Sequence, residues 1–443
     1  MMKHLFAVLL VLAAFSAYAQ PKFNSPYSRY GLGDLSARYL GVQAGRGGMT
    51  AAFNDPYHLN LGNPASFATL RATALETGIN AKYGHYTANA TTLDAWSGNL
   101  SYFALGFTLK NPINEALDRS RSDWRHGMGF SLTPYSQVGY NIQTQDTLPD
   151  LGAVRTQFEG SGGTYQLAWH GASKYKNTSF GATLGWLFGR SVYENTTSFI
   201  DSLPTFQSNF RDEVGVSGLT WNLGVQHDFV FQYSENDKTA PSKWLTIGGT
   251  FSSDHQINTT ADQLRLRSRG KTQSNAYADA DTLLYLTDVN GKMTLPGSFS
   301  IGLDYVKLNK MRIGAQFAMD QWANYKSEAR PITFRNTYSV SGGLEYIPDA
   351  FSYNRYMKRV RYRIGGYYRQ DPRSVNGVEL DDVGISLGLG FPLILPRQQT
   401  SFINFAVEAG KLGANSPIEE SYIRMTFGFT FNDNSWFFKR RFE

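Results

Sequence analysis

The sequence contains no cysteine and only seven histidines among its 443 residues. The absence of cysteine excludes a disulfide scaffold, a thiolate metal site, a cysteine nucleophile and a lipoprotein anchor. The histidines lack the close spacing along the chain that is typical of a structural metal site, so we expect neither a metal nor another cofactor. After the first twenty residues, no stretch approaches the roughly 20 consecutive apolar residues that a membrane-spanning helix needs.

The excess of one sign of charge over the other is also small. The 42 basic and 36 acidic residues are interspersed and give a formal net charge of +6, so we expect no nucleic-acid partner. The one local basic run, residues 358–363, alternates charged residues with bulky apolar ones. On a strand this alternation would place the charges on one face, which fits a barrel lumen as readily as a binding patch.

The chain is rich in aromatic residues and glycine, with 30 phenylalanines, 26 tyrosines and 43 glycines, which favours strands and turns over helices. Residues 1–19 have the pattern of a secretory signal peptide: Lys3 precedes an apolar run, and Ala17-Tyr18-Ala19 forms a cleavage site. We therefore expect export from the cytoplasm and cleavage near Ala19.

From residue 71 to residue 431 the chain alternates repeatedly between apolar residues and polar or small ones, with the period of two that is typical of strands. Lipid cannot hydrogen-bond the backbone, so a spanning sheet must close on itself with an apolar outer face. We therefore predict an all-β fold, an antiparallel transmembrane β-barrel of about fourteen strands that contacts the lipid of a Gram-negative outer membrane. A large soluble β-sandwich or propeller is the alternative. The predicted strands are 73–83, 99–109, 126–142, 162–174, 177–190, 217–233, 242–254, 297–307, 311–322, 335–347, 358–370, 381–391, 401–411 and 420–431.

Two details refine this prediction. In the last segment, Arg424 alternates with apolar residues and is expected to point into the lumen. Residues 191–216 and 255–296 are predicted to be long loops, and the second of these has room for a hairpin around 264–269 and 283–288.

Residues 20–70 have poor strand character and many glycines. Residues 46–56 and 60–68, above all Asn63-Pro64-Ala65, resemble the N-terminal hatch of the FadL-type outer-membrane transporters of long-chain fatty acids and other hydrophobic compounds. Weaker similarities to this family follow along most of the mature chain. The resemblance implies that residues 20–70 form a hatch inside the barrel lumen, with Gly47, Gly48, Asn63, Pro64 and Ala65 as its characteristic residues.

The resemblance further implies a kinked third strand that opens the wall sideways. Pro134 interrupts the third predicted strand, and proline cannot donate to a β-ladder. We expect either a lateral opening around Gly129, Pro134 and Gly139 or an ordinary bulge at the same place. The aromatic residues Tyr102 and Tyr367 are candidates for binding a hydrophobic small molecule in the lumen.

Two functions follow from these expectations. The first is passage of hydrophobic, fatty-acid-like small molecules through a hatch-gated lumen with a lateral exit. The second is a non-transporting barrel that docks within an outer-membrane protein export or assembly complex. The aromatic and basic tail, residues 432–443, motivates the second, with Trp436, Phe437 and Arg440 as candidate contacts to other outer-membrane or periplasmic proteins.

We do not expect an enzyme. Residues 384–388 match the G-x-S-x-G pattern of hydrolases around Ser386, but that motif requires a strand-to-helix turn. Here the sequence continues as a strand.

Overall fold

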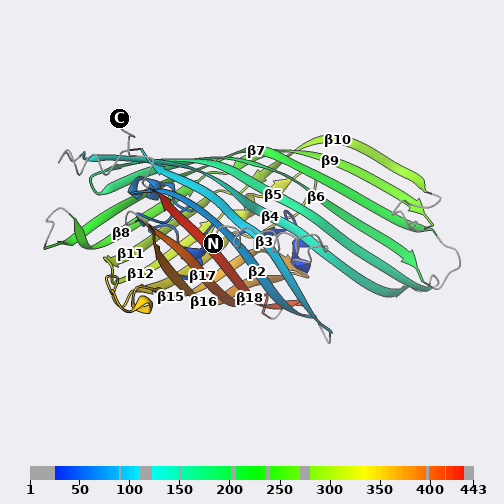
Figure 1. Ribbon diagram of the computed structural model, residues 1–443. Helices are drawn as coiled ribbons and strands as arrows, with labels where there is room; N and C mark the ends of the chain where they lie inside the picture. The colour runs from blue at the N-terminus through cyan, green and yellow to red at the C-terminus, as the bar shows by residue number, and fades with distance from the viewer. Residues whose placement is uncertain are drawn as a thin grey trace, which may run out of the picture.

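The computed structural model describes residues 25–88, 91–109, 122–148, 152–200, 206–235, 240–269, 280–395, 399–414 and 416–433, most of which lie in antiparallel strands (Figure 1). The strands are β1 (Asp34–Leu35), β2 (Thr73–Ala88), β3 (Thr91–Thr108), β4 (Trp124–Leu148), β5 (Gly152–Tyr175), β6 (Thr178–Phe199), β7 (Gln207–Tyr233), β8 (Pro241–Ser252), β9 (His255–Ser268), β10 (Asp281–Leu295), β11 (Ser298–Lys307), β12 (Met311–Asp320), β13 (Lys326–Ser327), β14 (Thr337–Tyr346), β15 (Arg361–Val375), β16 (Val378–Ile394), β17 (Thr400–Leu412) and β18 (Glu419–Asp433). The helices are η2 (Pro26–Arg29), α2 (Gly41–Ala44), η3 (Pro64–Thr69), η4 (Trp322–Asn324) and η5 (Tyr356–Lys358). Within the described ranges, none of the helices has both the length and the apolar character needed to cross a membrane.

Most wall strands pair with the strand that follows them in the chain, and the ladder between β18 and β2 closes the sheet into a barrel. Strands β8 and β9 occupy one position in the wall in succession, because β7 pairs with both of them. Strands β10 and β11 share the next position in the same way, because β10 pairs with β9 and β11 pairs with β8. Counted this way, the described wall is a closed fourteen-stranded antiparallel barrel. The predicted fold class is therefore confirmed.

The two faces of the wall differ as the alternation predicts. On β16, Ile385 and Leu387 are 65% and 55% exposed, whereas Ser386 between them is fully buried. On β18, Phe427 points outward, and Arg424 reaches the inside of the barrel, where its Nη1 lies 3.6 Å from Glu408 Oε2. The apolar outer face suits lipid, and the inner face carries the polar and small residues.

The predicted long loops at 191–216 and 255–296 were largely wrong. Strands β6 and β7 run through most of the first range, and β9 and β10 form the hairpin that the second range had room for. Together with β4 and β5, these strands continue well past the end of the rest of the barrel as one extended sheet, in the order β4-β5-β6-β7-β9-β10 (Figure 1). Polar residues in this part of the chain concealed the strands, because a sheet in water needs no apolar face toward lipid.

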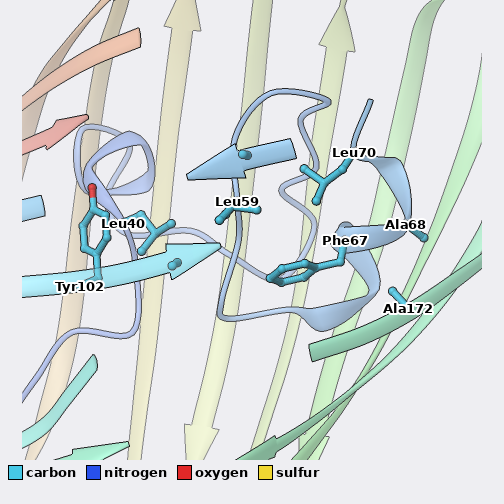
Figure 2. Close-up of a cluster of buried hydrophobic side chains, with 9 residues drawn as sticks. Leu40, Leu59, Phe67, Ala68, Leu70, Tyr102 and Ala172 are labelled. Atoms are coloured by element: carbon cyan, nitrogen blue, oxygen red, sulfur yellow. The ribbon is translucent and has the colours of Figure 1, made fainter. Parts of the chain in front are cut away.

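Residues 25–72, called the N-terminal segment below, lie against the inner face of the wall. The segment contacts inward-facing residues from strands all around the barrel, including β4, β7, β11, β15 and β17. Its own apolar side chains form a small core with the wall (Figure 2), whose buried members are Leu40, Leu59, Phe67, Ala68, Leu70, Ala74, Tyr102, Ala104 and Ala172. Each large side chain buried there contributes about 1.5–3 kcal/mol.

Strand β18 continues to Asp433, two residues past the predicted end of the barrel at 431. The predicted signal peptide and the tail residues Trp436, Phe437 and Arg440 lie outside the described residues.

Candidate functional site: a charged lumen closed by the N-terminal segment

The Asn63-Pro64-Ala65 motif fixes a helix start of the N-terminal segment against the wall. The Asn63 side-chain oxygen accepts a hydrogen bond from the Ala65 amide and so caps η3, and Pro64 occupies the first helical position, where no amide donor is needed. The Asn63 side-chain amide donates to the Ala51 carbonyl at 2.6 Å and reaches wall carbonyls of β7 and β8 at 3.3 Å. A side chain at the wall residue Gly181 would collide with this turn, since its Cβ would lie 2.4 Å from the Ala65 nitrogen.

Gly47 and Gly48 form a turn with positive φ angles, +73° and +78°, that glycine adopts without strain. The Gly47 amide donates a hydrogen bond to the Ser386 hydroxyl of β16 at 2.9 Å. A Cβ on Gly47 would lie 2.8 Å from the Gly366 carbonyl, so the turn packs directly on the wall backbone. Ser386, the serine of the hydrolase-like pattern, thus holds the turn in place.

A group of buried charges links this turn to four neighbouring strands, β11, β12, β14 and β15. The lumen charge cluster consists of Arg46 and Asp55 from the N-terminal segment and Asp304, Arg312, Glu345, Arg361 and Arg363 from the wall. Arg46 Nη2 lies 2.6 Å from Asp304 Oδ1, and Arg363 Nε lies 2.6 Å from Glu345 Oε2. The cluster combines four arginines with three carboxylates in a space closed to solvent.

Asp55 is the segment's anionic contact within this cluster. Its Oδ2 lies 3.1 Å from Arg361 Nη1 and 3.3 Å from Arg312 Nη2. Burial alone would raise the pKa of the Asp55 carboxyl, but the guanidiniums of Arg361 and Arg312 outweigh burial and lower it to about 2. Asp55 is therefore ionised at neutral pH.

Tyr39 and Asp34 connect the segment to the wall at two further points. The Tyr39 hydroxyl donates to Glu408 Oε1 at 2.7 Å, and burial raises the pKa of this hydroxyl. Asp34 Oδ1 lies 2.5 Å from Arg373 Nη1, which also donates to the Tyr27 carbonyl at 3.0 Å. Ion pairs and charge-assisted hydrogen bonds thus fasten the segment between Asp34 and Asp55.

A cavity of about 530 Å³ remains between the segment and the wall. Tyr102 lines it, whereas Tyr367 is buried in the wall beside it, with its hydroxyl 2.8 Å from that of Tyr422. Charged residues from both the segment and the wall line the cavity: Asp34, Arg38, Lys82, Asp320, Arg369, Asp371, Arg373, Asp382, Glu408, Glu420 and Arg424. An apolar ligand would displace water from these groups without replacing its hydrogen bonds, which is unfavourable.

The wall is incompletely paired between β3 and β4. The two strands pair only from Phe103↔Leu132 to Thr108↔Gly127. Past the Phe103↔Leu132 pair, β3 still extends back to Thr91 and β4 extends on to Leu148. The register of β4 against β5 shifts between Pro134 and Ser136, so Pro134 marks a bulge close to the point where the β3 ladder ends.

The N-terminal segment takes up the edge of β4 that β3 leaves free. Its strand β1 pairs with β4 at Asp34↔Gln137, and the Ser25 amide donates to the Gly139 carbonyl at 3.2 Å. Gly129 pairs with Gly106 in the β3–β4 ladder, and a Cβ there would come within 2.4 Å of the Phe67 ring. Pro134 and Gly139 therefore lie along the incompletely paired part of the seam, and Gly129 lies in its paired part.

Sequence reasoning missed the acidic wall residues of the lumen charge cluster and the role of Ser386. The available signal was a charged residue at an inward position of a predicted strand, as at Asp304 and Glu345. The basic run at 358–363 carried the same signal, and Arg361 and Arg363 do point inward, although η5 occupies its first residue and β15 begins only at Arg361. In the described part of the chain, no three histidine or acidic side chains gather in a way that could hold a metal ion.

Comparison with known proteins gives one family and one fold. A family model described as BamG matches residues 1–443. No curated protein matches the chain.

Among solved structures, the chain is similar to the Ralstonia pickettii toluene transporter TbuX, with a TM-score of 0.53 and 11% identity over 89% of this chain and 98% of that one. It is also similar to the Pseudomonas putida toluene transporter TodX, with a TM-score of 0.52 and 13% identity over 91% and 100% of the two chains. It is similar as well to a Pseudomonas aeruginosa FadL homologue, with a TM-score of 0.50 and 14% identity over 90% of this chain and 98% of that one. These likenesses establish a FadL-like outer-membrane barrel fold.

Proposed function

The chain belongs to the BamG family, and we propose that it is a non-transporting accessory subunit of an outer-membrane complex that exports or assembles proteins. The observation that carries this proposal is the fastening of the N-terminal segment inside the barrel. A gate for small molecules has to move, and a segment held by buried ion pairs on several strands resists movement.

The cavity between the segment and the wall also argues for this function over passage of an apolar molecule. Sites for apolar ligands are lined mainly by apolar and aromatic side chains with a few polar groups. Here arginines, a lysine and carboxylates from both the segment and the wall share the lining.

The direct test is to purify the full chain from native outer membranes in mild detergent and to quantify what accompanies it. We expect a partner in near-equimolar amount, together with reduced levels of other outer-membrane proteins when the chain is depleted from cells. An unrelated barrel with the same affinity tag is the control. A chain that is recovered alone, with an unchanged outer-membrane proteome after depletion, contradicts the proposal.

We extend the proposal to the tail. Trp436, Phe437 and Arg440 combine aromatic and basic side chains, a composition suited to protein contacts. Removing residues 434–443 is expected to reduce recovery of the partner while the barrel stays at its normal abundance. Unchanged recovery would remove the tail from the interface.

Passage of hydrophobic small molecules is the second candidate, and the incomplete β3–β4 seam favours it. Under this alternative the N-terminal segment acts as a gate, and a ligand leaves the lumen sideways near Pro134. The Asn99 side chain donates to the Gln137 side chain across the seam at 2.7 Å, so N99C/Q137C in this cysteine-free chain offers two thiols within reach of a short bismaleimide.

Cross-linking these thiols should stop uptake of toluene or a long-chain fatty acid by cells if the seam is the exit. The single variant N99C treated with the same reagent is the control. The candidate is eliminated if uptake is the same in three kinds of cells: those with the cross-linked seam, those with the seam not cross-linked, and those lacking the chain.

A further inference from the structure

The extended sheet ends in an unpaired edge at β10. Strand β10 pairs with β9 from Asp281 to Leu295, but on its other side it pairs only with β13, at Met293 and Thr294. Within the described ranges, residues 281–291 therefore have a strand neighbour on one side only. Backbone groups of an antiparallel strand point alternately to the two sides, so part of this run has its hydrogen-bonding groups directed at solvent.

This edge is also apolar on both faces. Leu283 and Tyr285 are 58% and 67% exposed, and Leu284, Leu286 and Val289 are exposed as well. Two register shifts against β9 interrupt the run, but it contains no lysine, arginine or proline. Proteins usually place such residues on free edges to prevent pairing with other chains.

Lipid cannot cover this edge, because the edge lies outside the membrane. The outward apolar band on the same wall position is formed by Phe299, Ile301 and Leu303 of β11. Leu286 of β10 lies about 40 Å from Phe299 along this wall position, at about 3.3 Å per residue. That separation exceeds the height of about 25 Å that a barrel's apolar band spans. Figure 1 shows β9 and β10 reaching the right-hand end of the molecule.

A second copy of the chain is also a poor occupant. Two copies in one membrane have the same orientation, so their β10 strands would both run toward the membrane. Direct edge-to-edge contact would then be parallel, whereas every ladder in the described barrel is antiparallel and parallel pairing is slightly less stable.

We propose that residues 281–291 bind an extended strand of a partner protein, which adds to the sheet beside β10 on the far side from β9. The proposal rests on the accessory-subunit function above and identifies the surface that it uses. Backbone hydrogen bonds would supply the pairing, and alternate apolar side chains of the incoming strand would cover Leu283 and Tyr285. Asp288, whose carboxylate has no ion-pair partner in the described chain, favours a basic residue on that strand.

The test is a double substitution with a matched control. L283K/Y285K places two charges on the edge, and F351K/Y353K places the same two charges at the same spacing on the connection between β14 and β15, where Phe351 and Tyr353 are 82% and 95% exposed. Both variants should fold, as judged by heat-modifiable migration on gels. L283K/Y285K should lower recovery of the equimolar partner by at least about tenfold, while F351K/Y353K should leave it unchanged.

A photo-reactive amino acid at Tyr285 gives the second readout. We expect it to cross-link to a peptide of the same partner, and the same probe at Tyr353 to give no such product. Equal partner recovery with L283K/Y285K and wild type, or a cross-link at Tyr285 to a second copy of this chain, would overturn the inference while leaving the accessory function standing. Absence of any stoichiometric partner with the wild-type chain would instead overturn the accessory function and this inference with it.

Discussion

Removing the negative charge of Asp55 should loosen the N-terminal segment far more than removing the positive charge of Arg46. Both residues come from the segment, and both are buried in the lumen charge cluster. The cluster holds four arginines and three carboxylates. Asp55→Asn leaves four arginines and two carboxylates, whereas Arg46→Met leaves three arginines and three carboxylates.

The expected magnitudes differ accordingly. Asp55 lies within 3.3 Å of two guanidiniums, and removing one partner of a buried ion pair costs about 3–5 kcal/mol. The lowered pKa of Asp55 corresponds to about 2 kcal/mol. We therefore expect Asp55→Asn to cost about 2–4 kcal/mol, or about a thirtyfold to thousandfold increase in the open population.

Arg46→Met should cost less for two reasons. Asp304 keeps a second arginine, since its Oδ2 lies 3.7 Å from Arg312 Nη1. The substitution also removes the Arg46 Nε, a buried donor that has no hydrogen-bond partner among the described residues. We expect less than about a tenfold increase in opening.

Trypsin cleavage after Arg38, in purified barrels in detergent, measures this opening. When opening is fast relative to cleavage, the cleavage rate follows the open population, and mass spectrometry identifies the released peptide. Glu379→Gln, which removes the partner of a more exposed ion pair with Arg335, is the control and should change the rate little. Equal rates for the two cluster variants, or a faster rate for Arg46→Met, would refute the charge-balance reasoning.

Three further predictions concern the same segment. Acid should mimic Asp55→Asn: because the pKa of Asp55 is lowered by Arg361, its contribution is complete above about pH 4 and disappears as the pH falls through about 2, which pepsin digestion across that range would show. Ser386→Ala should leave the Gly47 amide unsatisfied and cost about 1–3 kcal/mol in denaturant unfolding, with no change in ester hydrolysis by the purified protein; a loss of hydrolysis would restore the hydrolase hypothesis. Gly47→Ala should cost at least about 1 kcal/mol, because φ is positive there and its Cβ would meet the Gly366 carbonyl, so an unchanged unfolding midpoint would contradict the described turn.

Period-two alternation was enough to predict the barrel because it is a local property. A strand exposes alternate residues on opposite faces whatever its neighbours are, so the outward position of Phe427 and the inward position of Arg424 follow from the order of residues alone. The number of wall strands follows in the same way, since each apolar band must be tall enough to cross lipid.

Alternation fails where a sheet leaves the membrane. Residues 207–216 pair with both β6 and β9, yet they carry no apolar stripe toward lipid, so the sequence alone suggested a loop. Backbone pairing with two neighbouring strands decides the structure there, and the sequence of one strand does not contain its partners.

The sequence by itself determined that the chain alternates as a closed outer-membrane barrel must and that a glycine-rich segment precedes it. Only the tertiary structure decided where that segment lies and what holds it. Arg46 meets Asp304, and Asp55 meets Arg361, across more than half of the chain. The physical reason is that closure and register, which are set by all the strands together, bring those charges within a few ångströms, and no local pattern encodes a contact between residues so far apart.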